Sequence, residues 1–196
     1  MKTCGVVLVG GKGKRFGAEK VSLILEGKKI LHIIVKELSE VCSEIILAGR
    51  KGIVVEGYDI SCVEDIIKDR GPLAGIVSAM ELSKSDFFII VSCDMPFVCS
   101  SLFKLYIKYL YESDVTLSPK WGFPIGMRKE IYPFLRKALF SNSLCLFDVI
   151  KSSNFRIKVI PREEILSIGD EDIIFVNINT REDYNFALEM MRSVKG

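Results

Sequence analysis

Four short, continuous apolar runs constrain the fold of this chain more than any other feature of its sequence. They cover residues 6–9, 45–47, 87–91 and 173–176, and they are rich in β-branched and aromatic side chains. Runs of this length and composition are typical of strands that are buried on both faces, as in parallel sheets covered by helices. We therefore predict that these segments form central, mainly parallel strands.

Helical patterns occupy the stretches between the predicted strands. Apolar residues recur at helical spacing over 30–41, 73–82 and 101–111, and a last helix is predicted over 182–191. The alternation of strands and helices predicts an α/β fold, a three-layer sandwich around a mainly parallel, mixed sheet. Ligands of such folds bind beyond the carboxyl ends of the strands, so we expect the functional residues on the loops there.

The region 114–160 is less regular than the rest of the chain. It contains a strand-like segment at 115–118, a turn near Trp121 and a helical stretch around 132–140, and it could form an insertion or a lid. The sequence has no internal repeat and no linker-like composition. With 196 residues, the whole chain, 1–196, is predicted to be one domain.

Composition excludes several classes of function. Lys and Arg total 27 against 25 Asp and Glu, a formal charge of +2, so no bulk field favours a nucleic acid or an anionic membrane. The single histidine, His32, argues against His-rich zinc sites and histidine-dependent catalysis, and its apolar neighbours predict a packing role. The six cysteines form no CxxC pair and no apolar run approaches the length of a membrane span, which predicts a reduced, cytoplasmic protein.

A glycine-rich loop follows directly after the first predicted strand. Residues 10–20 contain four glycines and four cations. Glycines let backbone N–H groups approach an anion closely, and the clustered positive charge suits a triphosphate. The spacing matches neither the P-loop nor the dinucleotide fingerprint, which disfavours a Walker-type ATPase and a Rossmann dehydrogenase. An isolated loop of this kind could be a solvated turn, so other motifs must decide.

Those motifs resemble a known family. Residues 8–20 are similar to the LAGGxGxRMGxDK signature of the nucleotidyltransferases that include molybdenum cofactor guanylyltransferase, and the similarity continues, in the family's order, at 64–65, 71–75, 93–97 and 177–183. The resemblance spans most of the chain and implies a Rossmann-like nucleotidyltransferase fold. It also implies transfer of GMP from GTP to the phosphate of a molybdopterin-type cofactor, with release of pyrophosphate.

The same resemblance assigns roles to individual residues. It implies catalytic roles for Arg15, Lys20 and Asp94, a Mg²⁺ cofactor held by Asp94, and an acceptor segment at Asn177 and Asn179. In the broader sugar-nucleotide branch this last segment supplies a metal-coordinating Asn. The positions that match nucleotide-binding residues of the family are Leu8, Val9, Gly10, Gly11, Gly13, Lys20, Asp65 and Asp94.

The residues by themselves also allow simpler roles. Asp94, before Met-Pro, could cap a turn, Asp65 could stiffen the entry to a helix, and Asn179 or Thr180 could cap the final helix. A lone Asp at a strand end is nevertheless sufficient for Mg²⁺, which completes its shell with phosphate oxygens and water. A phosphate acceptor is already ionised at neutral pH, so no general base is required.

Two other functions remain open at this point. One is a related transferase that uses CTP, or another phosphorylated acceptor such as a sugar phosphate; an Asn that some relatives carry after the second strand is here Ala48 or Gly49. The other is a non-catalytic nucleotide-binding protein. The expected partners are GTP and a molybdopterin-type cofactor as small-molecule substrates, and molybdoenzymes or cofactor-delivery proteins, but no nucleic acid and no membrane.

Overall fold

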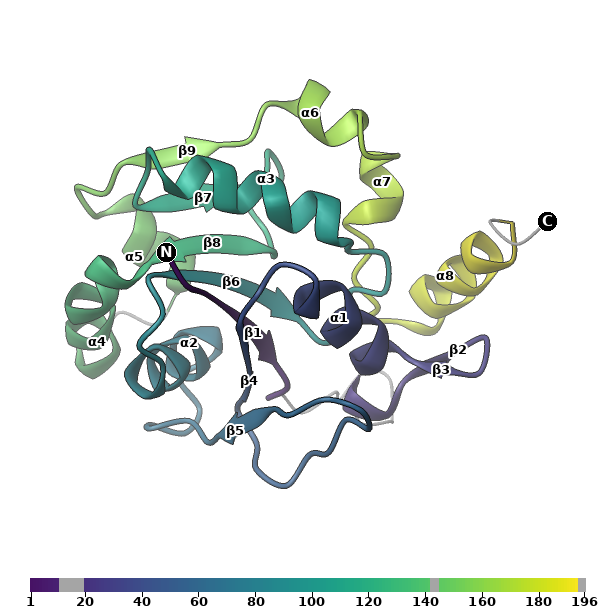
Figure 1. Ribbon diagram of the computed structural model, residues 1–196, viewed down its shortest axis with the longest axis horizontal. Helices are drawn as coiled ribbons and strands as arrows, with labels where there is room; N and C mark the ends of the chain where they lie inside the picture. The colour runs from purple at the N-terminus through teal and green to yellow at the C-terminus, as the bar shows by residue number, and fades with distance from the viewer. Residues whose placement is uncertain (11–19, 142–144, 194–196) are drawn as a thin grey trace.

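A central sheet of seven strands, in the order β5-β4-β1-β6-β8-β7-β9, organises the protein (Figure 1). The computed structural model describes residues 1–10, 20–141 and 145–193. The strands of the sheet are β1 (Thr3–Leu8), β4 (Glu44–Ala48), β5 (Ser61–Val63), β6 (Phe87–Ser92), β7 (Val115–Leu117), β8 (Ile125–Arg128) and β9 (Ile157–Val159). A separate hairpin consists of β2 (Ile24–Leu25) and β3 (Lys28–Lys29).

Strand β1 lies between β4 and β6 and is parallel to both. Val7 is opposite Leu47 of β4 and Val91 of β6, and every residue of β1 is buried. β5 adds to β4 in parallel, whereas β8 is antiparallel to β6 and β7. Burial on both faces explains the continuous apolar runs of the central strands. The predicted α/β sandwich with a mixed sheet is confirmed.

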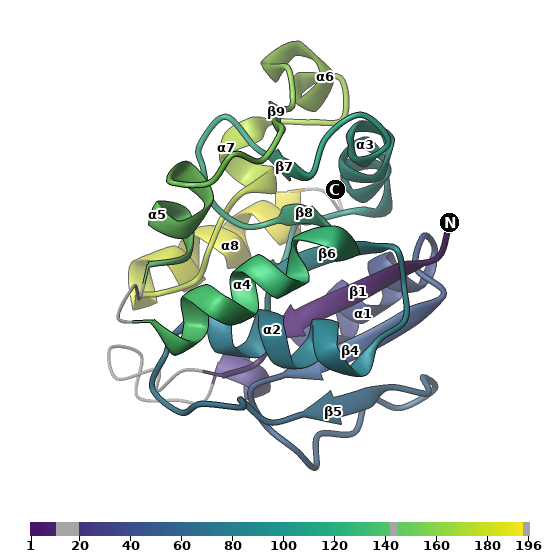
Figure 2. The same ribbon diagram turned by 90° about the vertical axis from the view of Figure 1, so that its left-hand side faces the viewer.

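Helices cover both faces of this sheet (Figures 1 and 2). α1 (Ile30–Ser39) and α3 (Ser100–Leu110) pack on one face, while α2 (Pro72–Leu82), α4 (Tyr132–Phe140) and α5 (Leu146–Lys151) pack on the other. The remaining helical elements are η1 (Lys20–Ser22), η2 (Lys129–Ile131), α6 (Arg162–Leu166), α7 (Glu171–Ile174) and α8 (Arg181–Ser193). None of the helices that the structure describes has the length and apolarity needed to cross a membrane.

The prediction of a strand at 173–176 is wrong. Residues Glu171–Ile174 form the short helix α7, and the chain continues to α8 as a loop. Asp170 caps α7, since its carboxylate accepts a hydrogen bond from the Asp172 N–H at 2.8 Å, and acidic residues in the first turn favour the helix dipole. A short apolar run does not distinguish a buried strand from a buried helical turn.

The region 114–160 belongs to the main sheet. It supplies β7, β8 and β9, and β9 pairs in parallel with β7 at the edge position. β9 was not predicted, because Ile157-Lys158-Val159 is short and only partly buried.

The packing role predicted for His32 is confirmed only in part. Its side chain is exposed on α1, and its ring lies edge-on to the ring of Tyr58, at 5.4 Å between centroids.

Two of the central strands approach each other closely just beyond their ends. Gly49 has a φ of +113°, and a Cβ atom on it would lie 2.7 Å from the backbone nitrogen of Gly10. Gly57, in the loop that follows, has a φ of +83°, but a Cβ atom there would meet no atom within 4 Å. Both glycines are conformationally required, and only Gly49 is also sterically required.

We expect Gly49→Ala to destabilise the protein much more than Gly57→Ala. The left-handed conformation should cost each variant about 1–2 kcal/mol, and the clash with the Gly10 backbone should add roughly 1–3 kcal/mol for Gly49 alone. Urea unfolding of the two variants measures the difference. Equal losses would show that the strand ends can separate without cost.

Candidate active site

Four parallel strands end at one edge of the sheet, which we call the carboxyl edge. The hydrogen bonds that join β1 to β4 and β6 continue past the strand ends, because Val9 N donates to Ala48 O at 2.9 Å and Cys93 N donates to Leu8 O at 3.2 Å. Gly10 and Asp94, which follow β1 and β6, are therefore held on neighbouring segments of backbone. This is the place where ligands of open α/β sheets bind.

Asp65, after β5, lies in a cradle of glycines at this edge. A Cβ atom on Gly75 of α2 would be 3.3 Å from Asp65 Oδ1, one on Gly49 would be 3.7 Å from Oδ1, and one on Gly10 would be 3.9 Å from Oδ2. Larger residues would fill the space around the carboxylate. The three glycines thus keep Asp65 next to the start of the glycine-rich loop.

The carboxylate of Asp65 has an unused hydrogen-bonding capacity. Its Oδ1 atom is buried without a hydrogen-bond partner, and burial raises the pKa of this carboxyl above its ordinary value. A buried acceptor that lacks a donor is costly and uncommon in folded proteins. The arrangement suits a ligand that brings its own N–H or O–H donor, such as the sugar or base of a nucleotide.

Asp94 is nearly inaccessible and is joined to a distant part of the chain. Its side chain and backbone together are 1% exposed, and its carbonyl oxygen accepts a hydrogen bond from Ile178 N at 2.9 Å. With the Asn177 amide turned to donate, its nitrogen lies 2.5 Å from Asp94 Oδ1 and 2.9 Å from Oδ2. Asn177 and Asp94 therefore form one polar pair at the carboxyl edge.

The residue types of this pair, a carboxylate and a side-chain amide, are compatible with a magnesium ion, because both carry oxygen atoms that can act as ligands. Mg²⁺ takes one or two protein oxygens and fills the remaining positions with phosphate and water. Within the described residues no group of three or more His, Cys, Asp or Glu could hold a metal, so a zinc-type site is absent there.

The segment that carries Asn177 is fixed by the start of α8. Thr180 N donates to Asp183 Oδ2 at 2.8 Å, and Asp183 N donates to Thr180 Oγ1 at 3.1 Å, a reciprocal cap. Asn179 N donates to the same carboxylate at 2.9 Å, and the Asn179 amide donates to Asn177 O at 3.3 Å. The predicted capping role of Thr180 is confirmed, and it keeps Asn177 at Asp94.

The structure brings together part of the predicted site. Leu8 and Val9 are buried at the end of β1, Gly10 is at the edge beside Asp65, and Asp94 contacts Asn177. Gly11, Gly13 and Arg15 lie outside the described residues, as does the side chain of Lys20, whose backbone begins η1. Gly75 belongs to the motif 71–75 that the sequence analysis singled out, whereas the role of Gly49 was missed; the signal was its position two residues after the predicted strand 45–47.

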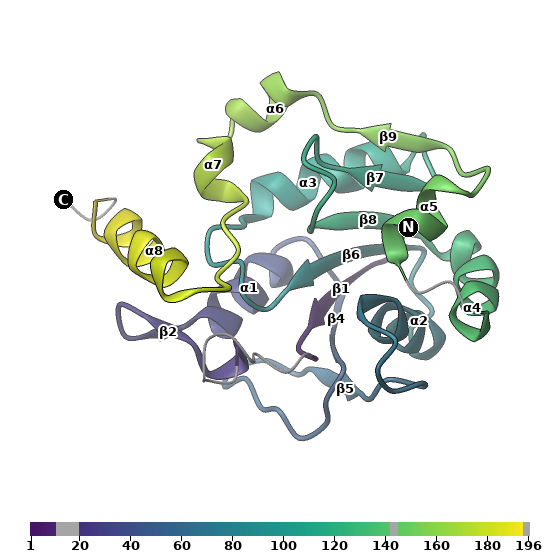
Figure 3. The ribbon, with the colours of Figure 1, turned by 180° about the vertical axis from the view of Figure 1, so that it is seen from behind.

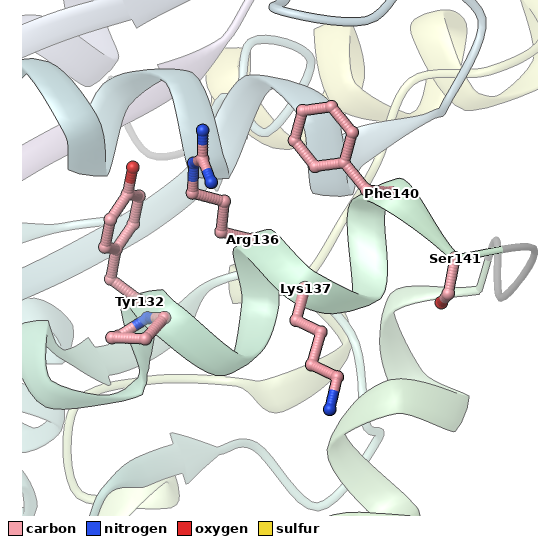
Figure 4. Close-up of a pocket in the computed structure, with 6 residues that line it drawn as sticks. Tyr132, Arg136, Lys137, Phe140 and Ser141 are labelled. Carbon is pink, nitrogen blue, oxygen red and sulfur yellow. The ribbon is translucent and has the colours of Figure 1, made fainter.

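An open cavity of about 480 Å³ lies elsewhere, along α4. Tyr132, Arg136 and Phe140 project from one side of the helix, and Lys137 points the other way (Figure 4). The cavity is lined by Tyr132, Pro133, Arg136, Lys137, Phe140 and Ser141, so no predicted site residue contributes to it. The polar residues at the carboxyl edge are therefore the stronger candidate for catalysis.

The family follows from comparison with known proteins. The family model of the MobA-like NTP transferase domain matches residues 5–152. This segment contains the glycine-rich loop, Asp65 and Asp94. The chain belongs to this family of nucleotidyltransferases, which confirms the resemblance drawn from the motifs.

Individual proteins are similar to this chain over nearly its whole length. A Bacillus cereus protein described as a probable molybdenum cofactor guanylyltransferase is 29% identical, covering 95% of this chain and 96% of its own length. The crystal structure of molybdopterin-guanine dinucleotide biosynthesis protein A from Archaeoglobus fulgidus has a TM-score of 0.80 at 23% identity, covering 97% and 99% of the two chains. The 4-diphosphocytidyl-2C-methyl-D-erythritol synthase of Anaerococcus prevotii shares the fold, with a TM-score of 0.75 at 18% identity, covering 97% and 98%.

We expect Asp65→Asn to stabilise the free protein at neutral pH while weakening nucleotide binding. Because burial raises the pKa of Asp65 in the folded state, its ionisation opposes folding as the pH rises, and Asn removes that penalty. The gain in Tm should disappear below about pH 4, where the carboxyl is protonated in both states. Thermal unfolding measured at intervals of about one pH unit between pH 3 and 8 tests this linkage.

The exposed Asp59 in the same region provides the matched control. Asp59→Asn should leave both Tm and nucleotide binding close to those of the wild type, since its carboxylate is solvated. A loss of stability in Asp65→Asn at pH 7 would contradict the interpretation of Asp65 Oδ1 as a buried acceptor whose ionised form destabilises the free protein.

Proposed function

We propose that this protein transfers GMP from GTP to the terminal phosphate of a molybdopterin-type cofactor, with release of pyrophosphate, in a Mg²⁺-dependent reaction. The observation that carries this proposal is the Asp94–Asn177 pair at the carboxyl edge, beside the start of the glycine-rich loop. The similarity to a probable molybdenum cofactor guanylyltransferase supports the choice of substrates.

Electrostatics determines what such a site must do. The acceptor phosphate and the nucleotide triphosphate are both anionic, so their approach requires positive charge and close alignment. Asp94 and Asn177 would hold Mg²⁺, which supplies charge neutralisation on the phosphate oxygens when bound. Arg15 and Lys20 are proposed to add the remaining positive charge in the transition state. The acceptor phosphate has a second pKa of about 6 and attacks without a general base.

The nucleoside part of the substrate is proposed to bind on the side of β4 and β5. Asp65 Oδ1 is a buried acceptor without a partner there, and Gly10, Gly49 and Gly75 leave room next to it. The acceptor is proposed to bind on the side of Asn177 and Asn179. This division places the reacting phosphates between Asp65 and Asp94.

A substrate panel tests the proposal directly. The purified protein is incubated with Mg²⁺, a molybdopterin-type acceptor and each of GTP, CTP, ATP and UTP, and the dinucleotide product is identified by mass spectrometry alongside pyrophosphate release. We expect the guanine dinucleotide as the main product. A preference for CTP, or transfer to a sugar phosphate instead of the pterin, would overturn the assigned reaction but not the family.

We expect Asp94→Asn to lower kcat at least a hundredfold without unfolding the protein. Loss of one electrostatic group at a reacting centre typically costs a factor of about 10²–10³, and the substitution keeps the shape of the side chain. Steady-state kinetics beside circular dichroism provides the test. Turnover like that of the wild type in a folded variant would exclude Asp94 as the metal ligand.

Asn177 and Asn179 should differ in their dependence on Mg²⁺. Because Asn177 contacts Asp94, Asn177→Ala should raise the Mg²⁺ concentration for half-maximal activity by roughly tenfold or more. Asn179→Ala should instead raise the KM for the acceptor and leave the Mg²⁺ dependence unchanged. Magnesium titrations of the two variants separate these roles, and equal shifts would show that both act through the segment as a whole.

A further inference from the structure

Helix α8 is joined to the β2–β3 hairpin by two side-chain contacts. The Tyr184 hydroxyl donates to the carbonyl oxygen of Ile24 at 2.7 Å, and Arg192 Nε donates to Glu26 Oε1 at 2.8 Å. Figures 1 and 3 show the helix and the hairpin side by side, away from the sheet. We call Tyr184, Arg192, Ile24 and Glu26 the α8 clasp.

One side of the clasp leads to the backbone of Lys20. Ile24 follows η1 (Lys20–Ser22) after a single residue, Leu23. Leu23 and Leu25 are buried in the core, and Leu23 O accepts a hydrogen bond from Ile30 N at 2.9 Å. The carbonyl that Tyr184 binds is therefore part of a short, anchored segment that begins at Lys20.

The other side of the clasp leads to Asp94. Tyr184 N donates to Thr180 O at 3.2 Å, directly after the reciprocal Thr180–Asp183 cap. The residues before this cap are bound to Asp94 through Ile178 N and the Asn177 amide. A continuous series of hydrogen bonds thus runs from the Asp94 carboxylate to the backbone of Ile24.

The hairpin turn itself is not built for local stability. Its two central residues, Glu26 and Gly27, have φ values of +46° and +78°. Turns of this kind favour Asn or Asp before Gly, and a two-stranded hairpin is marginally stable at best by itself. Glu26 occupies the unfavourable position while its carboxylate reaches Arg192, which indicates that contact with α8 matters more here than the turn.

We propose that the α8 clasp sets the position of the Lys20 backbone relative to Asp94, and that Tyr184 is its main positioning residue. This inference rests on the proposed transferase function. Lys20 and Asp94 come from different segments of the chain, and a displacement of about 1 Å at a reacting centre can cost a factor of about 10² in rate. The hydroxyl of Tyr184 acts at a distance from the reacting atoms, by holding the hairpin against α8.

The first test compares Tyr184→Phe with Tyr109→Phe. Both substitutions remove one hydroxyl; the Tyr109 hydroxyl donates to Glu164 and joins α3 to α6 instead. Tyr184→Phe should speed hydrogen exchange of the amides at 20–25 and lower kcat roughly ten- to a hundredfold, with a Tm close to that of the wild type. Tyr109→Phe should change neither the exchange at 20–25 nor kcat.

A double-mutant cycle with Lys20→Ala asks whether Tyr184 acts through Lys20. If it does, Tyr184→Phe should have little further effect on kcat once Lys20 is replaced, because effects on one coupled unit are not additive. A purely structural role would instead lower kcat by the same factor in both backgrounds. Factors that multiply would overturn the positioning role.

The ion pair provides a second, independent readout. Glu26→Asn introduces a residue that favours the turn but removes the carboxylate that binds Arg192, so it should still speed hydrogen exchange at 20–25. The charge-swapped double variant, Glu26→Arg with Arg192→Glu, should restore wild-type hydrogen exchange and kcat. Slower exchange in Glu26→Asn would show that the turn, and not the clasp, controls the hairpin.

The measurements distinguish failure of the clasp from failure of the proposed function. Hydrogen exchange requires no substrate, so unchanged exchange at 20–25 in Tyr184→Phe overturns the clasp whatever the enzyme does. If the wild-type protein transfers no nucleotide, the proposed function fails, and with it the catalytic role of the clasp. If the wild type is active and Tyr184→Phe exchanges faster with an unchanged kcat, the positioning role alone is excluded.

Discussion

The parallel pairing of β1 with β4 and β6 is the constraint on which the rest of the structure depends. It brings the ends of these strands, and of β5, to a single edge and places Gly10, Asp65 and Asp94 on adjoining segments. The pairing is maintained by apolar side chains buried on both faces, with Val7 between Leu47 and Val91 in register. A slip of one residue would exchange the faces of every side chain, so the core also fixes the alignment of the polar residues at the edge.

The carboxyl edge departs from good packing and hydrogen bonding at a cost to the free protein. Asp65 keeps a buried oxygen without a partner, and Gly49 combines a positive φ with a close approach to the backbone of Gly10. Neither feature strengthens the fold. Natural proteins carry such local departures from good packing and hydrogen bonding mainly where they bind or react with something. The cradle around Asp65 therefore carries more functional information than the cavity along α4.

The C-terminal part of the chain completes the site and does not extend the sheet. The loop after α7 returns to β6, where Asn177 and Ile178 bind Asp94, and the cap of α8 holds that loop in place. α8 then contacts the hairpin that follows η1. The family match over residues 5–152 ends before this part begins, so the contacts of Asn177 and Tyr184 had to come from the structure.

The sequence by itself determined the class of fold and the positions of its main polar residues. Continuous β-branched runs identify β1, β4 and β6, and helical spacing identifies α1, α2 and α3. Short motifs that resemble those of a known family identify Asp65 and Asp94. These signals are local, because burial on both faces and helix periodicity are written into a few consecutive residues.

The tertiary structure decided the assignments that depend on distant partners. The apolar run at 173–176 gave no sign that Asp170 would cap a helix there, and β9 is a strand only because β7 offers it an edge. The contact of Asn177 with Asp94 and that of Tyr184 with Ile24 join residues far apart in the chain. Hydrogen bonds of this kind form only after the core has packed, since the packing of β-branched side chains, and not the polar residues themselves, brings the partners within reach.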